Sequence, residues 1–288
     1  MYVLARLSGF LKTFRYAGGL AAMLVFSAAV PGLVSAQGLN MTGGTNGEPL
    51  TVDAEDGIEW RQNEQVFIAT GNARAVRGDL TIRADELRAY YREAAGGNTD
   101  VWRMDGAGRV VMTSPGETAT GEHAVYDVGR SILVLKPGTG GPPARLVSGG
   151  EEITATGQLE FWDTRDIAVA RGNARATQGD RTLYADVLVA HLVAGADGSE
   201  RVDRIEAFDA VKIVTSEDTV TSDRGTYQVE SGIATLVGSV KMQRGQNTLE
   251  GCRAVVDTRA GVSRLFSCKG AGDAGGRVKG QIVPKSAE

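Results

Sequence analysis

The chain has few of the residues on which enzymatic and metal chemistry depends. Its 288 residues include two cysteines and two histidines, and only 6% are aromatic. His123 and His191 stand where the other copy of the repeat described below has Arg224 and Tyr90, so neither belongs to a repeated constellation. C-x-x-C spacing, G-x-S-x-G, H-E-x-x-H and phosphate-binding glycine loops are missing. We therefore expect a protein that is not an enzyme, with no catalytic residue, no metal and no cofactor.

A hydrophobic run long enough to span a bilayer is also missing. Residues 1–36 contain three cations and no acid, then a short apolar run, a proline and a site of small residues: Arg6, Lys12 and Arg15, Ala17 to Val30, Pro31, and Val34-Ser35-Ala36. The run is 14 residues long, against about 20 for a membrane-spanning helix. This pattern is typical of a secretory signal peptide, which we expect to be cleaved after Ala36. An uncleaved membrane anchor is the alternative.

Positive charge is in short supply. After removal of residues 1–36, 28 lysines and arginines face 35 acids, for a net charge of −7. Nucleic acid is therefore not expected as a partner, since its binding depends on a basic surface.

The two cysteines, Cys252 and Cys268, both lie in the exported part. They flank the turn-like segment Asp257 to Gly261, so two strands leaving that turn would place them opposite each other. Export permits a disulfide, which we predict, with two buried free thiols as the alternative.

The main positive feature is an internal duplication. Residues 71–91 return as residues 172–192 with an offset of 101, matching at 12 of 21 positions. A weaker third copy spans Gly238 to Val256. Repeated supersecondary units stack into an elongated core, which favours a surface or channel function over a single catalytic pocket.

Alternation of apolar and polar residues, punctuated by glycine, Asp-Gly or asparagine about every ten residues, predicts an all-β fold. We expect a disordered lead over 37–49, and about 15 short antiparallel strands over 50–268, divided into repeats of about 50–150 and 151–268. A loop is expected at Pro137 to Gly150 and a flexible tail at 269–288.

Superposing the copies predicts which side chains face inward. The expected inner columns are Val66, Ile167 and Ile233; Ile68, Val169 and Thr235; Ala73, Ala174 and Val240; and Ile82, Leu183 and Leu249. Arg74, Arg175 and Lys241 are expected to face water. Because small residues recur inside, two facing sheets could enclose a slot, although a fully packed sandwich gives the same alternation.

Repeated polar and glycine positions have a structural interpretation. Asp85 and Asp186 are expected at turns or bulges, because the third copy has Cys252 at that position and a metal ladder would need a carboxylate there. Gly71-Asn72, Gly172-Asn173 and Gly238-Ser239 are expected at bulges or tight corners where a strand changes sheets.

Three sequence segments resemble those of the OstA-like family of lipopolysaccharide-transport proteins. They are Pro49 to Ala54; Ala69-Thr70-Gly71-Asn72-Ala73 with Gly78 and Ala84-Asp85; and Val125-Tyr126-Asp127-Val128 with its second copy at Tyr227. The resemblance covers about residues 49–268. It implies an open, slightly twisted β-jellyroll in the periplasm that holds the acyl chains of lipopolysaccharide between two sheets.

The resemblance also implies site residues and partners. Lipid-lining positions fall on Leu50, Val52, Val111, Tyr126 and Val128, and internal symmetry adds Tyr227 and Val229. The implied partners are the lipid A portion of lipopolysaccharide, an inner-membrane lipopolysaccharide-export complex, an outer-membrane lipopolysaccharide translocon, and further copies joined head to tail. The Cys252 and Cys268 pair and the loop from Pro137 to Gly150 depart from the family pattern.

Alternatives remain at this level. An inner-membrane-anchored subunit of the same fold would retain residues 1–36. The amino-terminal domain of the translocon is disfavoured because no long series of barrel strands follows residue 268. An exported β-solenoid enzyme acting on glycans would need paired carboxylates on adjacent coils, and a purely structural scaffold would need no ligand.

Overall fold

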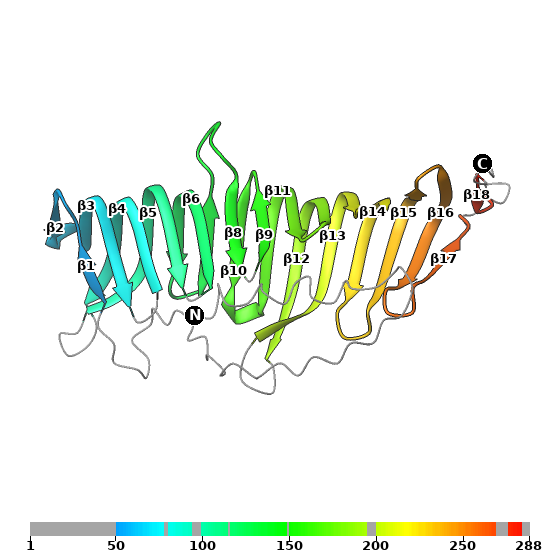
Figure 1. The fold of residues 1–288 in the computed structure, drawn as a ribbon. Helices are drawn as coiled ribbons and strands as arrows, with labels where there is room; N and C mark the ends of the chain where they lie inside the picture. The colour runs from blue at the N-terminus through cyan, green and yellow to red at the C-terminus, as the bar shows by residue number, and fades with distance from the viewer. Residues whose placement is uncertain are drawn as a thin grey trace, which may run out of the picture.

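The computed structural model describes residues 50–77, 80–93, 99–114, 116–148, 150–194, 200–268 and 276–283. The expected signal peptide and disordered lead lie outside the described residues. The strands follow one another in chain order along an elongated molecule, from β1 to β3 at one end to β16 to β18 at the other (Figure 1). The predicted all-β, jellyroll-like architecture of antiparallel strands is confirmed.

The first half of the chain contains eight strands and one 3₁₀ turn. They are β1 (Thr51–Asp53), β2 (Gly57–Arg61), η1 (Gln62–Glu64), β3 (Val66–Arg77), β4 (Leu80–Glu93), β5 (Thr99–Ser114), β6 (Glu117–Asp127), β7 (Ile132–Lys136) and β8 (Ala144–Ser148).

The second half repeats this series and extends it. It contains β9 (Glu151–Ala155), β10 (Gln158–Trp162), η2 (Asp163–Arg165), β11 (Ile167–Gln178), β12 (Arg181–Ala194), β13 (Glu200–Val214), β14 (Asp218–Gln228), β15 (Ile233–Arg244), β16 (Asn247–Asp257), β17 (Val262–Phe266) and β18 (Lys279–Gln281). The described residues form eighteen strands, more than the expected number of about 15. Part of the excess comes from pairs of short strands, such as β7 with β8 and β9 with β10, that lie beside one long strand.

Each long strand bends where its pairing register shifts. Between β3 and β4 the shift falls between Thr70 and Ala73, where Gly71 and Asn72 have φ angles of 82° and 44°. A Cβ atom on Gly71 would lie 2.7 Å from the backbone nitrogen of Asp56, so this corner requires glycine. Gly172-Asn173 and Gly238-Ser239 stand at the same shifts with nearly the same φ angles. These pairs are corners, as predicted.

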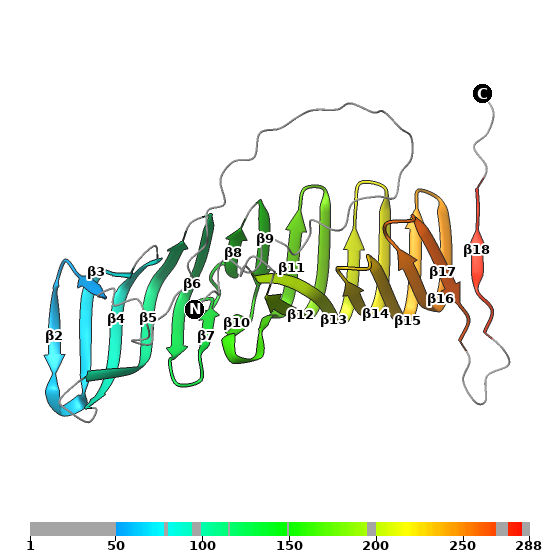
Figure 2. The same ribbon diagram turned by 90° about the horizontal axis from the view of Figure 1, so that it is seen from below.

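Bending gives the molecule two layers. The first layer contains β2, β7, β10 and β17 with the adjoining halves of the long strands, and the second contains β1, β8, β9 and β18 with the other halves. Figure 2 shows the same row of strands from below. Side chains between the layers form one core cluster that reaches from Ala69 to Ala234, and a small second cluster of Leu236, Val240 and Ala254 follows it.

Two of the four expected inner columns are wrong. Ala69, Ala170 and Leu236 belong to the core clusters, so their strand neighbours Ile68, Val169 and Thr235 face outward, and so do Val66, Ile167 and Ile233 two residues earlier. Ile68 is nevertheless buried, because it lies between Glu59 and Arg88, whose aliphatic stems shield it on the outer face.

The two columns beyond the corner are correct except at Leu249, since Val240 in the third copy is 1% exposed in the second core cluster. Ala73 and Ala174 are fully buried and Ile82 lies in the core cluster, whereas Leu249 in the last copy is 38% exposed near the end of the molecule.

A short part of the carboxyl-terminal segment that we expected to be flexible forms a strand. Residues 279–281 form β18, in which Lys279, Gly280 and Gln281 pair with Glu250, Leu249 and Thr248 of β16. Such pairing uses backbone groups, so a segment without apolar alternation can still form a strand. Cys252, at the corner of β16, forms a disulfide with Cys268, and their Cα atoms are 5.0 Å apart. No helix among the described residues combines the length and hydropathy needed to cross a bilayer.

Candidate functional site

The space between the layers is incompletely filled in the carboxyl-terminal half. An apolar cavity of about 50 Å³ lies there. It separates the two core clusters, since its wall includes Ala234 of the larger cluster and Leu236 of the smaller one. Its lining comes from β12, β13, β14 and β15: Arg181, Thr182, Leu183, Ile205, Ala207, Val211, Ile213, Gly225, Thr226, Tyr227, Ala234 and Leu236.

The rest of the interior is packed more closely. A smaller cavity of about 20 Å³ lies near the middle of the molecule, beside Leu146, Leu159 and Phe161. Of the 37 buried residues of the larger cluster, 16 are alanines, so the two layers touch through many small side chains. Burial of an alanine side chain contributes little apolar area, and separating the layers therefore costs less than in a core of leucine and phenylalanine.

Four of the expected lipid-lining residues face the interior at equivalent places in the two halves. Tyr126 and Tyr227 are 6% and 5% exposed, and Val128 and Val229 follow them in the same cluster. The backbone N–H groups of both valines donate to carbonyl groups of the preceding strand, at 3.0 Å and 2.9 Å. Tyr227 lines the larger cavity. Burial, together with the negative charge of Asp163, raises the pKa of Tyr126, so its phenol is neutral at physiological pH.

The three remaining expected residues do not share one placement. Val52 in β1 packs against the core cluster, so it does face inward. Val111 faces outward, because its neighbours Val110 and Met112 both belong to the core and strand residues alternate. Leu50 precedes β1 and is 38% exposed. The corner in β5 changes which of its residues face inward, so Val111 is not part of the inner lining, and Leu50 lies just before the first strand.

Several residues that line the larger cavity were missed from the sequence, among them Ala207, Val211 and Leu236. The duplication could have identified Leu236 as an inward-facing residue. Leu236 lies two residues before the corner Gly238, as the buried Ala69 lies two residues before Gly71.

Arg181 is the charged residue in the wall of the larger cavity. It starts β12 and lies two residues before the cavity residue Leu183, hence on the same face. The Arg181 side chain is 25% exposed, and its guanidinium lies 3.9 Å from the carboxylate of Asp180. A cation at this place is suited to an anionic group attached to an apolar chain.

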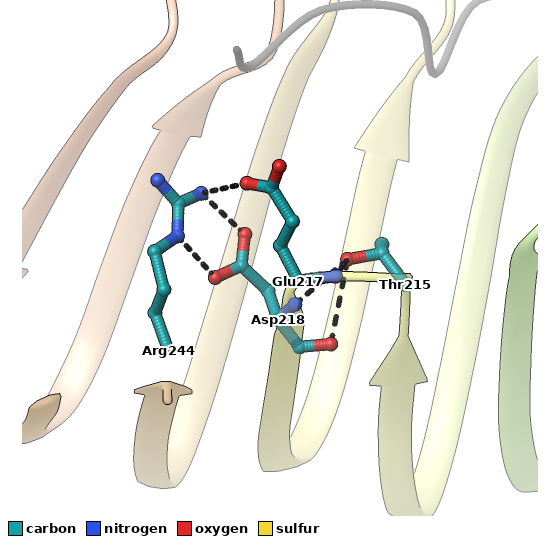
Figure 3. A network of polar contacts seen from close by, with 4 residues as sticks. All are labelled: Thr215, Glu217, Asp218 and Arg244. Carbon is teal, nitrogen blue, oxygen red and sulfur yellow. Dashed lines mark hydrogen bonds and ion pairs between the residues drawn. The ribbon is translucent and has the colours of Figure 1, made fainter. Parts of the chain in front are cut away.

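A polar network fixes the strands beside this cavity (Figure 3). Arg244 of β15 donates to both carboxylate oxygens of Asp218, at 2.7 Å and 2.6 Å, and lies 3.9 Å from Glu217. The hydroxyl of Thr215 accepts from the backbone N–H of Asp218 at 2.9 Å. The hydrogen bonds from Arg244 to Asp218 raise the pKa of Arg244. The network joins the turn between β13 and β14 to β15 and so holds the second layer in place.

The outer face carries several charged side chains. Arg175 and Lys241 are exposed, and Arg74 contacts Asp53 at 3.4 Å. Asp85 lies at the corner of β4, as predicted, and accepts a 2.9 Å hydrogen bond from Arg109. Asp186 likewise falls at the register shift of β12.

The two histidines have surface or structural surroundings. His123 is exposed, and His191 lies 3.3 Å from Glu206 and 3.1 Å from Arg204. Across the described residues, no group of three or more His, Cys, Asp and Glu side chains is placed to hold a metal ion.

Two known proteins are similar to parts of this chain. A relative from Rhizobium meliloti (strain 1021), described as an uncharacterized protein, is 32% identical over 124 residues, which are 41% of this chain and 64% of that protein, so the chain spans less than two thirds of the relative's length. The crystal structure of LptH, the LptA homologous periplasmic component of the lipopolysaccharide transport device from Pseudomonas aeruginosa, is 19% identical, covering 46% of this chain and 95% of that one, with a TM-score of 0.39.

A family model described as the LptA/(LptD N-terminal domain) LPS transport protein matches twice, at residues 51–156 and 152–262. The two matches follow the two halves of the duplication and together cover most of the chain. The resemblance to OstA-like proteins is confirmed, and the chain belongs to this LptA/LptD amino-terminal family of lipopolysaccharide-transport proteins.

Proposed function

We propose that this chain is a periplasmic carrier that binds the acyl chains of lipopolysaccharide between its two layers and carries no catalytic activity. The observation that supports this proposal most directly is the apolar cavity between the layers, with Tyr227 in its wall. Family membership supplies the class of cargo.

The physical need for such a carrier is clear. Several acyl chains expose hundreds of Å² of apolar surface, and each Å² costs about 25 cal/mol in water. The cavity of about 50 Å³ is smaller than the roughly 150 Å³ cavity that holds benzene, so a chain enters only if the layers move apart. The many alanines between the layers lower the cost of this movement.

The rim of the cavity is suited to the polar end of such a lipid. Arg181 is the charged residue among those that line the cavity, and its partly exposed side chain pairs with Asp180 at 3.9 Å. Arginine binds phosphate through two parallel hydrogen bonds, so we assign it the contact with an anionic headgroup.

A wider assembly is part of the same proposal. We propose cleavage after Ala36, release into the periplasm, and a bridge between an inner-membrane export complex and an outer-membrane translocon. Among the described strands β1, next to Leu50, pairs only with β3 and β17 pairs only with β16, so copies of this chain join end to end at these edges. Removal of Val262 to Cys268 is expected to weaken that association.

Site-specific photo-crosslinking in cells that transport lipopolysaccharide tests the carrier proposal. A photoreactive residue at Tyr126, Val128, Tyr227 or Val229 is expected to capture lipopolysaccharide, because all four face the interior. The same residue at Arg74 or Arg175 is the matched control, since the neighbouring alanines on both sides of each arginine are the ones that face inward. Absence of crosslinks at all four inner positions during active transport means that the interior is an ordinary packed core.

A further inference from the structure

The two halves of the chain meet in a junction of four short strands. β7 pairs with β10 in the first layer, and β8 pairs with β9 in the second. Leu135 lies opposite Leu159, and Leu133 lies opposite Phe161. All four side chains belong to the core cluster and are at most 4% exposed. This junction shows how one unit of this fold covers the edge of the next.

The amino-terminal end of the molecule is a second copy of one side of that junction. β1, β2 and η1 correspond to β9, β10 and η2 at the offset of 101, and the residue after each 3₁₀ turn has a left-handed φ of about 50°, at Gln65 and Asp166. Ile58 and Trp60 stand at the positions of Leu159 and Phe161. Among the described strands β2 pairs with β3 alone, and Ile58 and Trp60 are 52% and 58% exposed.

The carboxyl-terminal end is a second copy of the other side. β16 pairs with β17 and β18 as β6 pairs with β7 and β8, at an offset of 130, with Asp257 opposite Val262 as Asp127 is opposite Ile132. Within the 11 residues of β6, five recur in β16: Thr118, Gly121, Ala124, Val125 and Asp127 recur as Thr248, Gly251, Ala254, Val255 and Asp257.

The local geometry agrees with this equivalence. A Cβ atom on Gly121 would lie 2.8 Å from the carbonyl oxygen of Lys136, and one on Gly251 would lie 2.8 Å from that of Phe266. Leu265 therefore stands at the position of Leu135, at an edge that no other described strand covers.

We infer that a second copy of this chain docks its β1 and β2 against β18 and β17 of the first, in the register of the internal junction. This rests on the end-to-end association proposed above and specifies its contacts. In the first layer Ile58 lies opposite Leu265, Glu59 opposite Arg264 and Trp60 opposite Ser263. In the second layer Val52 lies opposite Gly280 and Asp53 opposite Lys279.

Charge complementarity supports this register. Glu59 and Arg264 are exposed on the outer face and become directly opposite, as do Asp53 and Lys279. Arg264 forms no ion pair with any described residue. At the internal junction Glu160 stands at the position of Glu59, and it forms an ion pair with Arg171 of its own half. The first half has Thr70 at the position of Arg171, so Glu59 lacks this cation. Glu59 is bonded only to the neighbouring Arg61 among described side chains, and both are exposed.

Side-chain volume supports it as well. The internal pair of Phe161 and Leu133 becomes Trp60 and Ser263, in which a larger residue faces a smaller one. In the second layer Val52 of one copy lies opposite Gly280 of the other. Because Gly280 has no side chain, Val52 can contact the neighbouring Leu249. Because the two complementary edges lie on the same chain, the contact is head to tail and a row of copies remains open at both ends.

Charge reversal on lipid-free mature protein tests this register by sedimentation velocity over a concentration series. Glu59→Arg alone and Arg264→Glu alone each place like charges opposite one another and are expected to weaken association about fivefold to tenfold. An equal mixture of the two variants is expected to recover association to within about twofold of the unmodified protein, because contacts between unlike variants have opposite charges and half of the molecules are unlike. Glu230→Arg and Arg130→Glu, both exposed and away from the edges, are the matched controls and are expected to change nothing.

Circular dichroism verifies that each variant is folded. The proposed register is overturned if the single variants associate like the unmodified protein, if the mixture associates as weakly as its components, or if the unmodified protein stays monomeric at the highest concentration. The carrier proposal is measured separately, since crosslinking of lipopolysaccharide at Val229 does not depend on the register between copies.

Discussion

The indole N–H of Trp60 donates a 2.7 Å hydrogen bond to the phenolic oxygen of Tyr91, and the Trp60 ring stacks on Phe67 with 5.4 Å between the ring centroids. The bond holds a largely exposed aromatic side chain in an inward orientation at a free edge. Most exposed tryptophans lose conformational freedom on binding, whereas this one is already ordered, which favours a contact with an incoming strand.

Tyr91→Phe removes this bond and leaves the ring in place. The free energy of unfolding is expected to fall by about 0.5 to 1.5 kcal/mol, since Tyr91 is buried and the indole N–H loses its partner. Urea denaturation followed by tryptophan fluorescence measures it. Tyr184→Phe, at an exposed tyrosine, is the control with no expected change. Equal stability of both variants and the unmodified protein would contradict the assignment.

Val229→Asp places a carboxylate in the interior between the layers. An unpaired charge in this apolar environment costs several kcal/mol, so the protein either loses bound lipid or loosens its fold. Lipid that co-purifies from native membranes, measured by mass spectrometry, is expected to disappear, with circular dichroism to separate the two causes. Arg175→Asp on the outer face should retain its lipid. A folded Val229→Asp protein with normal lipid content would refute an interior lipid site.

Cys252→Ser with Cys268→Ser removes the covalent link between the corner of β16 and the end of β17. For a separation of 16 residues the expected loss of stability is about 3 kcal/mol. Dithiothreitol should destabilise the unmodified protein by a similar amount and leave the double variant unchanged in urea denaturation. Labelling of both thiols in the native, non-reduced protein would show that the bond does not form in the cell.

Glu160 gives a pH dependence of stability. Burial raises its pKa, but hydrogen bonds from Gln158, Trp162 and Arg171 outweigh that effect and hold the pKa below its usual value. A carboxyl whose pKa is lower in the folded state stabilises the fold above its unfolded pKa, near 4.3, and this contribution is lost as the pH falls through the folded pKa. The unmodified protein should therefore be more stable than Glu160→Gln at pH 7.

The advantage over Glu160→Gln should shrink as the pH is lowered below about 4, when urea denaturation is repeated along a pH series. Glu64→Gln, at an exposed carboxylate, is the comparison and should show a much smaller difference at every pH. A difference for Glu160→Gln that is independent of pH would mean that its charge is not what stabilises β10.

Cleavage of the signal peptide predicts a mature chain that begins at Gln37 and is released with the periplasmic fraction. The basis is the 14-residue apolar run followed by Pro31. Mass spectrometry of the amino-terminal peptide measures it. Recovery of the intact chain from Met1, and only from membranes, would assign this protein to the anchored subunit of the same transport system.

The sequence by itself determined the repeats, the all-β class and the corners. Glycine and asparagine are the residues that most readily adopt positive φ angles, and a pair of them interrupts the alternation of a strand. The residue pattern is therefore enough to assign Gly71-Asn72 to a corner. The offset of 101 likewise made Tyr126 and Tyr227 equivalent, and both face the interior.

Only the tertiary structure decided which face of a strand lies inside. Alternation defines two faces but does not say which one the opposite layer covers, and long charged side chains can bury aliphatic residues on the outer one. Ile68 was misplaced for this reason, and Val111 was misplaced because the corner in β5 changes which residues face inward.

The tertiary structure also decided how the two ends relate. β18 forms through backbone pairing with β16, for which a glycine-rich segment has no side-chain signature. Strands β16, β17 and β18 are equivalent to β6, β7 and β8 mainly because they pair in the same registers. They share few residues, because the backbone geometry of a strand edge tolerates many side chains.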